Sequence, residues 1–189
     1  MGYIATDLAR VPSSGFEWYV FLLEDRWNDD LRRELVENFQ ILAAEVGPSA
    51  LVVRGSQPEQ FYDQVFAHYA LHERGFEARR FPLPALLITD TPPSEIEGHP
   101  DKLENAKMVL LPLESNYIRP GSITAILREV ANTLRDSDSI KALQSLDKSR
   151  IEKRWGWITR YFNFKPSFLG FEVDVDQILN DLFLNRKTS

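Results

Sequence analysis

Two histidines in one predicted helix have a spacing that can bind a metal. His68 and His72 lie four positions apart, which places two imidazoles on the same helix face, within reach of one ion. The residues after His72 do not complete the zinc-protease pattern His-Glu-x-x-His, so a third ligand would have to come from a distant part of the chain. We interpret the pair as ordinary helix histidines and predict no metal ligand and no cofactor.

Cysteine is absent from all 189 residues of the chain. Its absence excludes disulfides, thiolate metal sites and cysteine nucleophiles. The chain also lacks the phosphate-binding pattern Gly-x-x-x-x-Gly-Lys, the dinucleotide-binding pattern Gly-x-Gly-x-x-Gly and the hydrolase pattern Gly-x-Ser-x-Gly. We therefore predict no catalytic residue, and the sequence favours a binding protein over an enzyme.

A stretch rich in basic and aromatic residues lies between residues 148 and 165. It holds six basic residues and one acidic residue, in a chain whose net charge is -6. Such a composition can stack on bases and neutralise phosphates, or lie on an anionic membrane, and Arg154, Trp157 and Arg160 are the predicted contacts. The alternative is structural, because the apolar positions from Trp155 to Phe162 have the spacing of a helix that packs on the rest of the chain.

Strands and helices are predicted to alternate along the middle of the chain. Four apolar stretches have the length and the aromatic or β-branched content of buried strands: residues 16–24, 50–54, 85–89 and 107–113. Three stretches have the apolar spacing of helices: residues 28–46, 58–74 and 122–134. Asn28 or Asp29 caps the first helix, and Gly47-Pro48 ends it. Because this helix connects the first two strands, we expect them to pair in parallel.

The element order β-α-β-α-β-β-α, with a proline at the entry of the third strand, resembles the thioredoxin-like fold. The resemblance covers residues 16–136 and implies an α/β core in which three helices cover a four-stranded sheet that ends in an antiparallel hairpin. It also implies that Pro84 is the cis-proline that this family places beside the N-terminus of the first helix. The Cys-x-x-Cys motif of the family is missing, because the corresponding segment, residues 24–30, reads Glu-Asp-Arg-Trp-Asn-Asp-Asp.

The resemblance implies a ligand site where the third strand begins. In such folds the backbone beside the cis-proline pairs with an extended peptide, or with glutathione. The corresponding residues are Leu83 and Pro84, with Arg26, Trp27 and Asn28 in the segment before the first helix. Alternatively, Pro84 only begins a strand, and the acidic residues of the segment only complement the helix dipole. The segment has no serine or tyrosine in place of the cysteine, which weakens the analogy with glutathione transferases.

Three parts are expected along the chain: an N-terminal arm over residues 1–15, the core over 16–136, and a helical extension over 137–189 that packs on the core. Residues 91–106 form a longer connection than the hairpin turn of the family, which suggests a lid, a docking loop or a solvated insertion. No apolar run approaches the length that spans a bilayer, and no signal peptide is recognisable, so we expect a cytoplasmic location.

These expectations combine into a redox-inactive, thioredoxin-like binding or scaffold module that recognises a protein or peptide partner. Two alternatives stay open. One is a cysteine-independent enzyme similar to glutathione transferases. The other is contact with nucleic acid or a membrane surface through residues 148–165.

Overall fold

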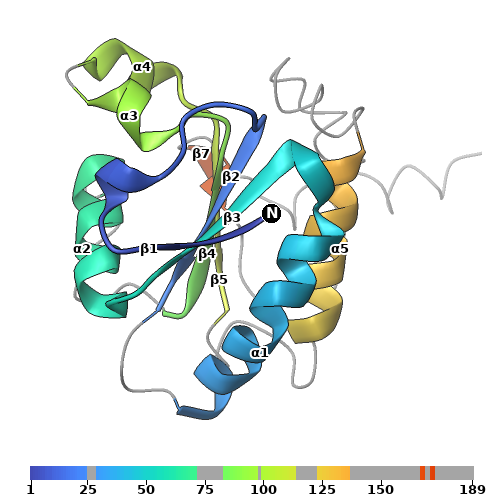
Figure 1. The fold of residues 1–189 in the computed structure, drawn as a ribbon. Helices are drawn as coiled ribbons and strands as arrows, with labels where there is room; N and C mark the ends of the chain where they lie inside the picture. The colour runs from blue at the N-terminus through green and yellow to red at the C-terminus, as the bar shows by residue number, and fades with distance from the viewer. Residues whose placement is uncertain are drawn as a thin grey trace, which may run out of the picture.

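The strands of the chain form one mixed sheet, and helices cover both of its faces (Figure 1). The computed structural model describes residues 1–24, 29–71, 83–97, 99–113, 123–136, 167–168 and 171–172. Within these residues the sheet has seven strands, whose spatial order is β1 (Gly2–Ala5), β3 (Ala50–Gly55), β2 (Trp18–Leu23), β4 (Ala85–Thr89), β5 (Met108–Pro112), β6 (Ser167–Phe168) and β7 (Phe171–Glu172). The protein is therefore a mixed α/β protein.

Strand direction divides the sheet into two parts. β2 pairs with β3 in parallel, as predicted from the helix that connects them, and β1 pairs with β3 in parallel on its other side. β4 pairs with β2 antiparallel, and β5 pairs with β4 antiparallel. The carboxyl ends of β1, β3 and β2 therefore lie at the same edge of the sheet as the beginning of β4.

Each face of the sheet carries its own apolar core. Even-numbered residues of β2, such as Trp18 and Val20, pack under α1 (Asp29–Glu45) and α5 (Ile123–Arg135). Odd-numbered residues, such as Tyr19 and Phe21, pack under α2 (Pro58–His68). This double coverage explains why β2 has no alternation of polar and apolar residues in the sequence.

Two of the predicted helix ends can be compared with the structure. The helix over residues 28–46 is present as α1, and Gly47 follows it with φ of 71°, a conformation that glycine adopts without steric cost. The helix predicted to reach residue 74 ends earlier, at His68. Ala70 has a positive φ there, and the Leu71 amide donates to the Phe66 carbonyl at 3.1 Å, a bond that closes the helix end.

The prediction of a loosely attached N-terminal arm is wrong for residues 2–5. These residues form β1, and the amides of Val52 and Ser56 donate to the carbonyls of Met1 and Ala5, both at 2.8 Å. A short 3-10 helix, η1 (Leu8–Arg10), follows and buries Leu8. A four-residue edge strand is too short to show a period in the sequence, since its stability comes from the backbone of β3 and not from its own pattern.

The long connection between β4 and β5 is ordered. It contains α3 (Pro93–Ile96) and α4 (Pro100–Asn105), each beginning at a proline. The Tyr69 hydroxyl donates to the Thr91 carbonyl at 2.8 Å, and His68 Nε2 donates to the Pro93 carbonyl at 2.7 Å. These two bonds hold the beginning of the connection against the end of α2, so within residues 91–97 the structure favours a packed insertion.

Most of the predicted C-terminal extension, residues 137–189, lies outside the described residues. Its described part is strand and not helix, because β6 pairs antiparallel with β5, and β7 pairs antiparallel with β6. Among the described helices, none combines the length and the apolar character needed to cross a membrane.

Buried tyrosines on the α2 side of the sheet are expected to make stability fall at alkaline pH. Burial, assisted by the charge of Asp63, raises the pKa of Tyr62 to about 12. The unfolded chain loses this proton near pH 10, whereas the folded chain holds it up to about pH 12, so folding loses stability as the pH rises through this window. Urea unfolding should therefore show a smaller alkaline loss for Tyr62→Phe than for the wild type. An equal loss in both proteins would contradict this assignment.

Candidate functional site

Three strand ends meet where the sequence predicts a ligand site. The register pairs Leu22 of β2 with Arg54 of β3, and Leu23 of β2 with Ala85 of β4. Glu24 follows β2 directly, and Pro84 directly precedes β4. We call the group formed by Glu24, Arg54, Leu83 and Pro84 the Pro84 edge. Ligands of open α/β sheets commonly bind outside the carboxyl ends of parallel strands, which is where this group lies.

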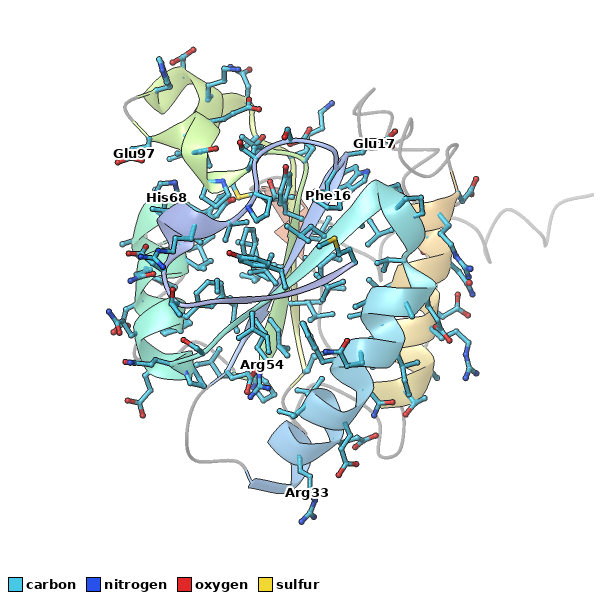
Figure 2. All side chains as sticks on the ribbon, viewed as in Figure 1. Phe16, Glu17, Arg33, Arg54, His68 and Glu97 are labelled. Carbon is cyan, nitrogen blue, oxygen red and sulfur yellow. The ribbon has the colours of Figure 1, made fainter. Side chains whose placement is uncertain are left out.

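A buried ion pair lies at the Pro84 edge. Arg54 Nε donates to Glu24 Oε1 at 2.6 Å, and the two side chains are 18% and 1% exposed. Charged groups are rarely buried to this degree unless they are paired, because removing a charge from water costs several kcal/mol. Arg54 lies at the same end of the sheet as Arg33 of α1, so the pair is near the beginning of that helix (Figure 2). The pair fixes the geometry of the strand ends on the α1 side of the sheet.

The backbone at Leu83 and Pro84 is the part of this edge that can bind a chain. The bond between them is cis, which the family resemblance implies at this position. The Pro84 carbonyl accepts a hydrogen bond from the Leu113 amide at 2.6 Å. Among the described residues, neither the amide nor the carbonyl of Leu83 has a hydrogen-bond partner. With respect to the described residues, the backbone of Leu83 thus offers an unused donor and an unused acceptor.

The side chain of Leu83 is half-buried. It packs against the apolar cluster under α2, together with Leu103 of α4. Alternate residues of a strand face opposite sides, so Leu83 faces the α2 side while the ion pair lies on the α1 side. A segment bound at Leu83 would therefore meet the exposed part of this side chain on the α2 side.

The other predicted site residues are not tested, because the structure does not describe them. Arg26, Trp27 and Asn28 lie outside the described residues, as do the predicted partner contacts Arg154, Trp157 and Arg160. His72 also lies outside the described residues, and His68 is bonded to the connection after β4. In the part of the chain that the structure describes, no group of three or more histidine, aspartate and glutamate side chains could hold a metal ion.

Sequence analysis missed Glu24 and Arg54 as site residues. A signal was present, because each is the first charged residue after an uninterrupted apolar run, WYVFLL before Glu24 and ALVV before Arg54. Parallel pairing of these two strands places their last residues at the same edge, where opposite charges can meet. From the sequence, both residues were predicted only as the last residues of their strands.

A separate groove lies at the opposite end of the sheet, between η1, α2 and α3. Its volume is about 410 Å³, and its polar lining includes Asp7, Gln64, His68 and Glu97. Figure 2 shows His68 and Glu97 far from Arg54. Asp7 accepts from the Ala9 amide, and Gln64 accepts from the Leu8 amide, both at 3.0 Å. Several polar groups of this groove thus hold the fold of the N-terminal segment.

The chain was compared with protein-family models, with curated proteins and with solved structures. None of the three comparisons finds a match.

Proposed function

We propose that this chain is a thioredoxin-like protein without dithiol chemistry, and that it binds an extended segment of a partner protein at the Pro84 edge. The fold part of the proposal is supported by the spatial order β3-β2-β4-β5, with the first pair parallel and the other two antiparallel. It is also supported by helices on both faces of the sheet (Figure 1). The absence of cysteine removes the dithiol reaction from such a fold.

One observation carries the binding part of the proposal, which is that the backbone of Leu83 has no hydrogen-bond partner among the described residues. An extended peptide pairs with such a donor and acceptor through its own amide and carbonyl, which provides affinity without depending on the peptide sequence. The half-buried Leu83 side chain then contributes apolar contact to a side chain of the peptide. A bound segment would lie at Leu83, just before the beginning of β4, with the Glu24–Arg54 pair at the same edge of the sheet.

The alternatives from the sequence receive no comparable support. Glutathione binding would use the same backbone groups of Leu83, but its reaction needs a group that none of the described residues of the Pro84 edge supplies. Contact with nucleic acid or a membrane concerns residues 148–165, which lie outside the described residues. Both therefore stay predictions from the sequence.

Removing the Leu83 side chain is expected to weaken peptide binding. Peptides selected from a display library against the wild-type protein serve as the probe, and their affinity is measured by calorimetry. Leu83→Ala should lower the affinity about tenfold, because it removes an apolar contact next to the paired backbone.

Leu103→Ala is the matched control, since Leu103 packs against the same apolar cluster from α4 and should leave the affinity unchanged. Equal affinities for Leu83→Ala and the wild type would contradict the proposal. Competition by glutathione at millimolar concentration would favour the enzyme alternative instead.

A further inference from the structure

β1 is the outermost of the described strands of the sheet, and none of the described strands pairs with its second edge. Among the described strands, β3 is its only neighbour. The carbonyls of Met1 and Ala5 accept hydrogen bonds from β3. Because every second residue of a parallel pair bonds to the neighbouring strand, the backbone amide and carbonyl of Tyr3 also point toward β3. The amides and carbonyls of Gly2 and Ile4 consequently point away from the sheet. In Figure 1, β1 crosses in front of the other strands.

This edge lacks the features that usually protect an edge strand. Natural sheets discourage pairing with other chains by means of charged side chains, prolines and bulges at their edges. Residues 1–6 contain no charged side chain and no proline. Met1 and Ile4 are each 56% exposed, and they are two of the three exposed large hydrophobic residues in the described part of the chain.

The helix above this edge carries uncharged and charged residues on the side next to the edge, and the charged ones, Arg33 and Glu37, lie toward the beginning of the helix. Gly2 lies directly beneath α1, since a Cβ atom built on it would be 3.0 Å from the Ala43 Cβ. By helical periodicity, Val36, Gln40 and Ala44 project from α1 on the same side as Ala43, toward the open edge. All three are uncharged, and Gln40 and Ala44 are exposed. The opposite side of α1 faces α5 through Ile41 and other residues.

We propose that β1 pairs antiparallel with β1 of a second copy of this chain, about a two-fold axis at Tyr3. Gly2 of each copy would then face Ile4 of the other, and the two pairs would exchange four backbone hydrogen bonds. The exposed Ile4 side chain would cover Gly2 of the second copy, which has no side chain. The result is one continuous sheet through both molecules.

The position of α1 also favours a dimer about a two-fold axis at Tyr3. α1 contacts both β1 and β3, so it lies above the boundary between them. With strands spaced by about 4.8 Å, the two α1 helices would come to roughly 10 Å from each other across the axis. Packed helices keep distances of about 8–10 Å, and the small side chain of Ala44 permits this approach.

A second copy fits this surface better than an unrelated strand does. A two-fold interface requires a surface that complements itself, and this edge has equal numbers of outward donors and acceptors and no charged side chain. The Met1 ammonium donates to the carbonyls of Ala43, Gly47 and Ala50 in its own chain. Stable interfaces bury about 800 Å² on each partner, which is more than a four-residue strand edge provides. The side of α1 that carries Val36, Gln40 and Ala44 supplies additional area next to the strand.

The test is the oligomeric state of the full chain by sedimentation velocity over a wide range of concentration. We expect the wild type to dimerise, and Ile4→Lys to be monomeric because it places a charge on the edge. Ile41→Lys is the matched control, since Ile41 is 51% exposed on the other side of α1, and it should dimerise like the wild type. Urea unfolding should find both variants about as stable as the wild type.

The absence of cysteine allows a second test, of the register. Residues facing each other across the axis have Cα atoms about 4.5 Å apart, which permits a disulfide. Tyr3→Cys should therefore form a cross-linked dimer under mild oxidation. Thr6→Cys should not, because the two copies of residue 6 would be roughly 20 Å apart.

A wild type that stays monomeric at the highest concentration would overturn the proposal. A dimer that persists in Ile4→Lys would also overturn it, because the interface would then lie elsewhere. Efficient cross-linking through Thr6→Cys, with none through Tyr3→Cys, would overturn the proposed register. Each result is independent of peptide binding at the Pro84 edge.

Discussion

Replacing Arg54 by methionine is expected to destabilise the protein by about 3–5 kcal/mol. The substitution keeps much of the apolar stem but removes the guanidinium from the Glu24 carboxylate, whose side chain is 1% exposed. A buried charge that loses the guanidinium beside it retains its desolvation cost with less compensating attraction. The free energy of unfolding, measured with urea near neutral pH, reports this loss.

Arg135→Met is the control for the loss of a positive charge. Arg135 is exposed near the end of α5 and bonds to the Asn132 side chain, so its replacement should cost less than about 1 kcal/mol. The double variant Glu24→Gln and Arg54→Met should regain part of the stability, because it removes the buried charge as well. A loss below about 1 kcal/mol for Arg54→Met would mean that the pair does not stabilise the edge.

Replacing Gly55 by alanine is expected to cost about 1–3 kcal/mol. A Cβ atom at this position would lie 2.3 Å from the Phe61 Cβ and 2.5 Å from its Cγ, closer than non-bonded atoms can approach. Phe61 belongs to α2, so β3 and the beginning of α2 would have to separate. The cost appears in the same urea measurement as a lower midpoint.

Introducing Gly55→Ala into the Phe61→Ala variant tests whether its cost comes from the clash with the Phe61 Cβ and not from the packing of the Phe61 ring. Alanine at position 61 keeps the Cβ that is nearest to the added methyl group, so the cost of Gly55→Ala should persist there. Ser56→Ala, an exposed position next in the chain, should be close to neutral. A Gly55→Ala protein as stable as the wild type would contradict the close approach of β3 and α2.

The main strands and helices could be predicted from the sequence, for a physical reason. β2, β3 and β4 are buried on both faces, so they appear as continuous apolar runs, and α1 and α5 carry regular apolar stripes. β1 and η1 could not be predicted, because their stability depends on the edge of β3 and on α2. The early end of α2 depends on Ala70, which adopts a positive φ that its residue type does not suggest.

The candidate site was only partly predictable. The position of Pro84 came from a family resemblance, whereas the Glu24–Arg54 pair depends on the register between β2 and β3. A register is a property of two strands together, and neither strand sequence contains it alone. The lack of a described partner for the Leu83 backbone likewise depends on which groups the neighbouring strands leave unpaired.

Amide hydrogen exchange at Leu83, followed by NMR with and without a display-selected peptide, tests the central claim most directly. In the free protein this amide has no partner among the described residues, so we expect fast exchange. Saturating peptide should slow exchange at Leu83 while leaving the amides of Gly2 and Ile4 at the β1 edge unchanged. Bound peptide with unaltered exchange at Leu83 would contradict the claim that the Pro84 edge is the binding site.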